Sequence, residues 1–597
     1  MGKKVLFGIL VCLVILTVLS GSCGSTTPST TQTASTSIST KTPATTATAA
    51  TTTSISTTST ATKANWWDKF GEPQYGGTLT YRLYAVFNNF DNYTAQGSIY
   101  NVWLETLWAW NWAVDRDMYS FKIMYTPDEY MQGNLAESWE LSDPQTITVH
   151  LRQGVKWQNK APVNGREFTA YDVLEHYDRV LGTGSGYTKP APPSYAMTTN
   201  AYDKVTAVDK YTVQIKFKKP GLILSTAMGD LSFIEAPESV KAEGGMAAFK
   251  NAVGTGPWIP NEYIDSTSLT CVKNPDYWRY DECHSKNKLP YADQYKVLYI
   301  LDTSTAEAAL RTGKIDLIES VSWQQADSLL KTNPELLKST AMSPGPGLMP
   351  RCDKAPFTDI NVRKALQLAI DLKGIAKYYG DTVDSTPMGM VSTQLGTFCY
   401  PYSQWTQSLK DEYSYNPTRA KELLAAAGYP DGFKTNAVAS VNLDTQLLIV
   451  LKSYLKEINV DMEINNMDLP TWFAYVGAGK QDQMTYFNTT GLSAAPANLL
   501  QTFLSTNSRN YYKTNDPTYD ALFAKYSTLT DSTKAGPIVM EADKYTLEQH
   551  WAIHTLPVPS FTLYQPYLKG YSGEFGAPGA FFGFYMARCW VDQKLKK

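Results

Sequence analysis

Residues 25–64 constrain the fold of this chain more than any other segment, because they cannot take part in a packed core. Of these 40 residues, 33 are Ser, Thr or Ala, and Lys41 and Lys63 carry the only charges. A stretch without an apolar period buries too little surface to offset the conformational entropy lost on ordering. We therefore expect a flexible stalk over 24–65 and a folded body from about residue 66 to residue 597.

The segment before the stalk has the features of an export signal. Lys3 and Lys4 precede an apolar or small run over 5–19, and 15 residues suit a signal peptide better than a membrane span of about 20. Small residues then lead to Cys23, as in a bacterial lipobox, although Leu19 stands one place earlier than that pattern expects. We expect a signal peptide with an imperfect lipobox over 1–23 and lipidation of Cys23, which holds the protein at the outer face of the cell membrane. Ordinary cleavage, giving a periplasmic protein, and an uncleaved anchor are the alternatives, and all three export the rest of the chain.

Composition argues against nucleic acid as a partner and leaves a mid-sized organic ligand open. The chain has 53 Lys and Arg against 56 Asp and Glu, so it lacks the basic surplus that phosphate neutralisation needs. Aromatic residues make up 13 % of the chain, and 54 of them are Trp or Tyr, which combine a flat apolar body with a polar group. Such side chains suit a wet binding cleft for a peptide or a carbohydrate.

Helix and strand signals alternate along the folded body and predict an α/β or α+β class. Alternating apolar residues predict a half-buried strand at 146–152, and a buried strand is expected at 315–318. Thr169 is expected to cap a helix, with Asp172 three residues on in the capping-box position. Asn416 is expected to cap another helix. No solenoid repeat is present.

A series of short motifs in this body resembles one protein family. The motifs run in the family's order over nearly all of 75–565, and any one of them alone would be weak evidence. The segments are 76–79 (GGTL), 89–91 (NFD), 135–139 (LAESW), 151–157 (LRQGVKW), 168–173 (FTAYDV), 254–258 (GTGPW), 274–278 (NPDYW), 309–316, 356–366 and 369–371. Together they resemble the large extracytoplasmic solute-binding proteins of ABC importers that serve dipeptides, oligopeptides and nickel complexes.

The resemblance implies a two-lobed, hinged periplasmic-binding-protein fold of the α/β class with an extra inserted subdomain. The first lobe would comprise 66–110, 205–318 and 556–597, the inserted subdomain 111–204, and the second lobe 319–555. Such lobes close over a solute, because contacts made only in the closed form shift the population toward closure. A membrane permease that prefers the closed form then takes up the solute, and no bond in the solute is broken.

The residues leave the solute open between a peptide and an oligosaccharide. Peptide binders of this family carry an acid late in the second lobe that pairs with the peptide's amino terminus, whereas 486–491 contain none. An ammonium group buried without an anion costs several kcal/mol. Either another acid replaces it, or the ligand is a sugar on an aromatic platform; the family favours peptide-like solutes. The expected ligand-binding residues are Tyr93 and Trp103 in the first lobe and Trp405, Trp472, Tyr486, Phe487 and Asn488 in the second.

An exported hydrolase and a structural surface protein are the competing classes, and the motifs favour neither. Of the five His, only His550 and His554 have a metal-chelating spacing, and they lack the Glu of a zincin motif. The sequence contains no nucleophile elbow, phosphate loop or complete dinucleotide fingerprint. We expect no catalytic residue, no metal and no cofactor. The expected partners are a small-molecule ligand, an ABC permease and the membrane through a lipid anchor.

Overall fold

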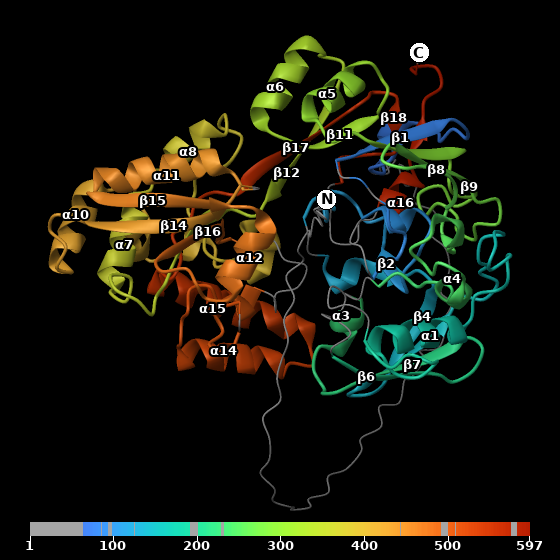
Figure 1. Cartoon of the computed structure of the whole chain (residues 1–597), viewed down its shortest axis with the longest axis horizontal. Coiled ribbons are helices and arrows are strands. Elements are labelled where there is room, and N and C mark those ends of the chain that lie inside the picture. The colour runs from blue at the N-terminus through green and yellow to red at the C-terminus, as the bar shows by residue number, and fades with distance from the viewer. Residues whose placement is uncertain are drawn as a thin grey trace, which may run out of the picture.

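The protein folds as two lobes that lie side by side and are joined at one end (Figure 1). The computed structural model describes residues 64–596 except 85, 87, 94–97, 124–125, 191–200, 229–231, 442, 491–498, 508 and 575–581. The expected signal peptide, Cys23 and nearly all of the stalk lie outside these residues. Within the described part of the chain, no helix combines the length and apolar character that a membrane crossing requires.

The first lobe is built on a seven-stranded mixed sheet. In spatial order its strands are β12 (Leu337–Ser343), β17 (Val558–Tyr564), β11 (Leu317–Val321), β1 (Thr78–Leu83), β10 (Gln294–Tyr299), β9 (Ser268–Lys273) and β8 (Trp258–Ile264). β1 runs parallel to β10 and β11, and all other neighbours are antiparallel. Inward-facing residues such as Tyr81 and Val297 share one core with Trp103 and Trp258.

A four-stranded antiparallel sheet forms a separate layer within the first half of the chain. Its order is β4 (Ala136–Asp143), β5 (Thr146–Leu151), β7 (Thr212–Phe217) and β6 (Tyr202–Ala207), and α1 (Ala170–Leu181) packs on it. The strand expected at 146–152 is therefore confirmed and ends at Leu151, but it is buried on both faces rather than half-buried. The helix after Thr169 is also confirmed, because both hydrogen bonds of the capping box with Asp172 are present.

The second lobe has its own four-stranded sheet and most of the helices. The sheet order is β13 (Pro346–Pro350), β16 (Met484–Asn488), β14 (Phe433–Ser440) and β15 (Val460–Met467). Asn416 caps α10 through a hydrogen bond from the Arg419 amide, as the sequence predicts. The helices are α7 (Ile360–Leu368), α8 (Leu372–Tyr378), α9 (Gln407–Glu412), α10 (Pro417–Ala426), α11 (Thr445–Glu457), α12 (Leu469–Gly477), α14 (Pro517–Ser527) and α15 (Ala535–Gln549).

Short elements complete the first half of the chain and the C-terminus. The helices are α3 (Ile223–Met228), α4 (Pro237–Lys241), α5 (Thr303–Arg311), α6 (Trp323–Thr332) and α16 (Phe582–Met586). Two antiparallel pairs are β2 (Trp108–Trp110) with β3 (Met131–Gly133), and β18 (Leu568–Lys569) with β19 (Trp590–Val591).

Two strands carry the chain between the lobes. β12 pairs with β17 in the seven-stranded sheet and leads directly into β13 of the second lobe, while β17 returns the chain (Figure 1). Away from these strands, Ile123 and Leu222 of the first lobe pack against an apolar cluster beneath α14 and α15. The backbone at Gly221 also lies close to that of Ser527, because a Cβ added there would stand 3.7 Å from the Ser527 carbonyl oxygen.

The buried strand expected at 315–318 begins two residues later, at Leu317. Asp316 explains the shift, since its carboxylate accepts the Thr80 amide proton at 2.7 Å while its own amide donates to the Thr80 carbonyl at 2.9 Å. The Asp316 carboxylate therefore accepts the hydrogen bond from the Thr80 amide that a backbone carbonyl would accept if the strand began earlier.

The expected lobe boundaries stay a prediction. β7 pairs with β5 and with β6 although all of it lies beyond residue 204, and β12 pairs with β17 although it lies beyond 319.

Candidate functional site

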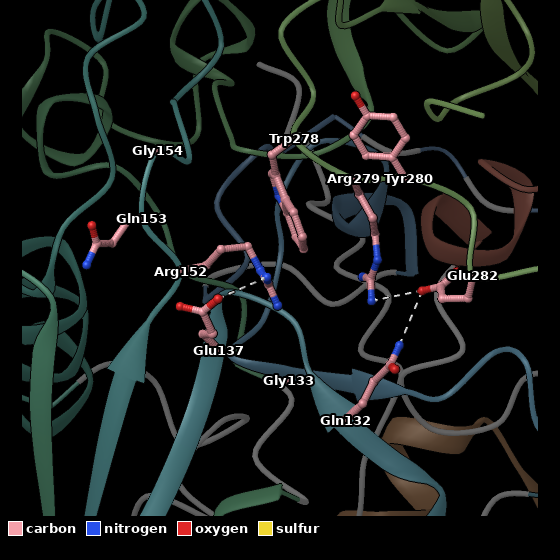
Figure 2. Close-up of a pocket in the computed structure, with 10 residues that line it drawn as sticks. All are labelled: Gln132, Gly133, Glu137, Arg152, Gln153, Gly154, Trp278, Arg279, Tyr280 and Glu282. Atoms are coloured by element: carbon pink, nitrogen blue, oxygen red, sulfur yellow. Dashed lines mark hydrogen bonds and ion pairs between the residues drawn. The ribbon is translucent and has the colours of Figure 1, made fainter. Parts of the chain in front are cut away.

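A solvent-open pocket of about 820 Å³ lies in the first half of the chain (Figure 2). Three segments line it: 132–137 around the start of β4, 152–154 after β5, and 278–282 in the loop between β9 and β10. A volume of this size is typical of small-molecule sites. All the lining residues lie between 132 and 282, so the second lobe contributes none of them.

Local packing fixes the floor and one wall of the pocket. At Gly133 the chain turns so tightly that a Cβ would stand 2.2 Å from the Ala136 carbonyl oxygen, so only glycine fits. Trp278 is held by its indole nitrogen, which donates to the Glu105 carboxylate at 3.0 Å, and the Tyr277 hydroxyl donates to the same carboxylate at 2.9 Å. Burial raises the pKa of Glu105.

Two guanidinium groups flank Trp278. Arg152 lies 4.7 Å from the ring centroid and Arg279 lies 5.2 Å from it, both within cation–π range. Arg152 donates from Nε to the Asn134 carbonyl at 3.2 Å, and its Nη1 stands 3.7 Å from a Glu137 oxygen. The pKa of Arg152 is lowered, first by burial and then by the neighbouring Arg279 charge.

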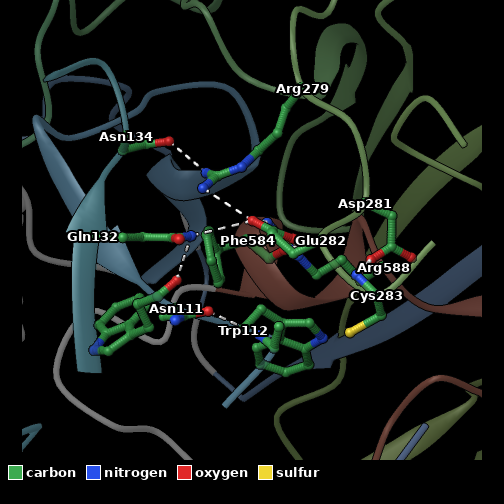
Figure 3. Close-up of polar contacts among 12 residues, drawn as sticks. Asn111, Trp112, Gln132, Asn134, Arg279, Asp281, Glu282, Cys283, Phe584 and Arg588 are labelled. Atoms are coloured by element: carbon green, nitrogen blue, oxygen red, sulfur yellow. Dashed lines mark hydrogen bonds and ion pairs between the residues drawn. The ribbon is translucent and has the colours of Figure 1, made fainter. Parts of the chain in front are cut away.

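Glu282 joins the pocket to the C-terminal part of the chain (Figure 3). Its two oxygens accept from Arg588 at 2.7 and 2.8 Å, and one of them also lies 3.1 Å from Arg279. These two arginines outweigh burial and lower the pKa of Glu282 to about 2. Gln132 donates both to Glu282 at 3.2 Å and to the Trp110 carbonyl at 2.9 Å, which ties β3 to the same network.

None of these pocket residues was a candidate from sequence, although Arg152 and Trp278 stand inside the family motifs. Sequence reasoning took the motif residues as scaffold. The signal that points to a site, an arginine stacked on a tryptophan, joins residues 126 positions apart, so it exists only in the folded chain.

The structure buries Tyr93 and Trp103, the expected first-lobe ligand residues. The Tyr93 hydroxyl lies 3.2 Å from His176, whose Nδ1 is 2.7 Å from Glu235. Trp103 packs on Phe90 in the lobe core. Its carbonyl lies so close to Gly254 that a Cβ there would stand 1.7 Å away, which explains the glycine of the 254–258 motif. Their contact with a ligand stays a prediction.

Of the second-lobe candidates, the structure brings Trp472 and Phe487 together and separates Trp405 from them. The Trp472 and Phe487 rings stack with centroids 4.7 Å apart. Tyr486 alternates to the other face of β16 and donates its hydroxyl to the Asp444 carbonyl at 2.8 Å, and Asn488 ends the strand half-buried. Trp405 packs instead with Tyr400 and Tyr413 in a separate cluster. Their ligand contacts also stay predictions.

His550 and His554 do not share a helix face, so the chelating geometry of an i, i+4 pair does not arise. α15 ends at Gln549, and His550 takes a left-handed conformation with φ 50°. His550 pairs with Glu412 at 2.9 Å, and burial lowers the pKa of His554 to about 3. Among the described residues, no group of three His, Cys, Asp or Glu side chains is placed to hold a metal ion.

Two lobes on separate sheets, joined by two strands, define the class of hinged binding proteins. The family model of the bacterial extracellular solute-binding proteins, family 5 (middle region), matches residues 131–511. The chain belongs to this family.

Relatives named for different solutes are similar in sequence to this chain over about three quarters of its length. Heme-binding protein A of Haemophilus influenzae is 27 % identical over 481 residues, which cover 75 % of this chain and 83 % of that protein. The dipeptide-binding protein of Pseudomonas aeruginosa is 26 % identical over 480 residues, covering 76 % and 85 %. Among solved structures, the periplasmic binding protein DppA from Helicobacter pylori, in complex with the peptide STSA, shares the fold with a TM-score of 0.65. It is 21 % identical, and the match covers 87 % of this chain and 99 % of that one.

Proposed function

We propose that this protein is the extracytoplasmic substrate-binding component of an ABC importer and captures peptide-like solutes by lobe closure. The observation that carries the proposal is the connection between the lobes. β12 and β17 join two separately cored sheets, an arrangement that lets the lobes rotate as bodies about two strands. A solute that contacts both lobes stabilises the closed form, which a permease then recognises.

Peptide-like solutes are favoured by the relatives. The names reported above are a heme-binding protein, a dipeptide-binding protein and a complex with a four-residue peptide, and none names an oligosaccharide. We propose that the residues Tyr93, Trp103, Trp405, Trp472, Tyr486, Phe487 and Asn488 contribute to the solute site. Phe487 and Asn488 are the best supported of these, because they are half-buried at the end of β16 rather than enclosed in a core.

The place of action is proposed from the N-terminal sequence. The signal peptide exports the chain, lipidated Cys23 anchors it at the membrane surface, and the Ser/Thr-rich stalk lets the folded body reach both solute and permease. Mass spectrometry of the protein recovered from membranes tests the anchor, since a lipidated chain begins at Cys23 and carries acyl chains.

Thermal unfolding of the purified protein with peptide and oligosaccharide pools tests the function. A solute that binds only the folded state at 100–1,000 times its Kd adds about 3–4 kcal/mol to the free energy of unfolding and raises Tm. Mass spectrometry of the bound material should recover the peptide intact. Stabilisation by sugars alone would contradict the peptide proposal, and release of cleaved product would contradict a binding role altogether.

A further inference from the structure

The pocket around Arg152 is complete without the second lobe. Its lining comes wholly from 132–137, 152–154 and 278–282, and it is open to solvent while Leu222 keeps the two lobes in contact elsewhere. A ligand held there needs no lobe closure. Its binding is therefore separate from solute capture between the lobes.

Arg152 differs from Arg279, the other arginine that lines this pocket, in the donors left open at the end of its guanidinium. Nε donates to Asn134, but among the described residues neither Nη atom has a hydrogen-bond acceptor, because the Glu137 oxygen at 3.7 Å is beyond hydrogen-bonding distance. The cation–π contact with Trp278 and the Nε hydrogen bond to Asn134 restrain the guanidinium, while the Arg152 side chain stays 31 % exposed. The fork of donors is thus oriented before any ligand arrives.

The other charges of the pocket satisfy one another. Arg279 donates to the Asn134 side chain at 2.5 Å and lies 3.1 Å from Glu282, which also pairs with Arg588 through both oxygens (Figure 3). The carboxylate nearest to Arg152 is Glu137, whose side chain is 57 % exposed and is free to turn into solvent. An incoming anion can take its place.

We propose that this pocket binds the carboxylate of a small organic anion, with Arg152 as its bidentate partner. A planar carboxylate matches the planar guanidinium fork through two parallel hydrogen bonds, and Glu137 already presents the same chemical group to it. The carboxylate has two sources, a free organic acid or the C-terminus of a short peptide. This proposal does not depend on the proposed function, because the second lobe, which must close over a captured solute, contributes no residue to this pocket.

Isothermal titration calorimetry with succinate at low salt tests the proposal. Arg152→Gln should weaken succinate binding about tenfold or more. Arg311→Gln is the matched control, since Arg311 on α5 is 38 % exposed and lies 3.9 Å from Glu307, and it should leave binding unchanged. Absence of heat with the wild-type protein up to millimolar succinate, or equal affinity of wild type and Arg152→Gln, would overturn the proposal.

A second variant, Glu137→Gln, keeps the proposal testable even if Arg152→Gln fails to fold. Glu137→Gln removes the competing carboxylate from an exposed position, so succinate should bind about threefold more tightly. Weaker or unchanged binding would contradict displacement of Glu137. A short peptide and its C-terminal amide distinguish the two sources, because only the free carboxylate should compete with succinate if the site accepts peptide C-termini.

Small-angle scattering distinguishes succinate binding in this pocket from capture of a solute between the lobes. Saturation with succinate should leave the radius of gyration unchanged, whereas lobe closure would reduce it. A reduction on adding succinate would place the anion between the lobes and would overturn a closure-independent site.

Discussion

Two carboxyl groups, those of Glu319 and Asp543, have pKa values that burial raises to about 7. Glu319 on β11 accepts a hydrogen bond from the Tyr81 hydroxyl at 2.8 Å, while its other oxygen has no hydrogen-bond partner among the described residues. Burial raises the pKa of Glu319 to about 7. Such a group is protonated in the folded protein at pH values where it is ionised in the unfolded chain, so it couples folding to pH.

Glu319→Gln should flatten the dependence of stability on pH. Because the folded-state pKa is raised, the stability that wild-type Glu319 contributes is fully present below about pH 4.5 and is lost as pH rises through 7. Relative to wild type, the variant should therefore gain on the order of 2–3 kcal/mol in free energy of unfolding between pH 5 and pH 8. Urea denaturation at both pH values measures this.

The exposed Glu335 provides the control for that comparison. The hydrogen bond from Asn333 lowers the pKa of Glu335, so this group stays ionised in both states and Glu335→Gln should leave the wild-type dependence between pH 5 and pH 8 unchanged. Asp543, whose pKa burial also raises to about 7, keeps part of the slope in both variants. An identical slope for wild type and Glu319→Gln would contradict a buried, protonated Glu319.

Arg588→Leu should destabilise the protein by about 2–4 kcal/mol, because it removes one of the two arginines that pair with the largely buried Glu282 carboxylate. Arg588 is 1 % exposed at its side chain and supplies two of the hydrogen bonds that Glu282 accepts. The double variant Arg588→Leu/Glu282→Leu should recover at least half of the loss in urea denaturation. Arg419→Leu, which breaks an exposed pair with Glu422, should have no resolvable effect. A double variant no more stable than the single one would show that packing, not charge, is at stake.

At the scale of helices and strands, two helix-capping side chains differ in the contacts that they make beyond their own helix. Asn416 only caps α10, whereas Asp172 completes the capping box of α1 and also pairs with Arg166 through both oxygens at 2.6 and 3.0 Å. Arg166 in turn contacts Glu238 at the start of α4. Through Arg166, the Asp172 carboxylate is therefore linked to Glu238 and joins α1 to α4, which a helix cap alone does not do.

Asp172→Ala should therefore cost more than Asn416→Ala. We expect about 1 kcal/mol for loss of the Asn416 cap and about 2–4 kcal/mol for Asp172, because the buried carboxylate also satisfies Arg166. Thermal and urea denaturation of both variants gives the comparison. Equal losses would mean that the Arg166 contact adds nothing to the cap.

Local signals predicted the elements well, and long-range contacts explain the misses. Thr169 and Asn416 cap their helices because capping chemistry involves residues a few positions apart. The start of β11 was misplaced because Asp316 bonds to Thr80, 236 residues earlier. The spacing of His550 and His554 did not reveal that α15 ends at Gln549, nor that His550 pairs with Glu412, 138 residues away.

The candidate pocket lay beyond prediction because its defining contacts join residues far apart in sequence. Arg152 meets Trp278, and Glu282 meets Arg588, only after β5, the loop before β10 and the C-terminal segment are assembled. The sequence identified the family through motifs, several of whose residues prove to be scaffold. Gly254 exemplifies this, since it makes room for the Trp103 carbonyl.

At the scale of the whole molecule, the lobes touch at a place distinct from their connecting strands. Leu222, next to α3, packs against the apolar cluster of the second lobe, and Figure 1 shows α3 beside the end of α14. Partial burial of this leucine across the lobe boundary favours the arrangement in which the lobes touch, whether or not a solute is bound. We expect the contact to raise the fraction of solute-free molecules in that arrangement.

Leu222→Asp should open the molecule. A carboxylate at this boundary loses the apolar contact and resists burial, so small-angle scattering should give a larger radius of gyration for the solute-free protein. Solute affinity should fall in proportion to the closed population, since apparent Kd is the intrinsic Kd divided by the competent fraction. Val208→Asp, at a 55 % exposed position of the same half of the chain, should change neither quantity. If Leu222→Asp keeps the wild-type radius and solute affinity, the lobes are held in place by the two strands and the solute alone.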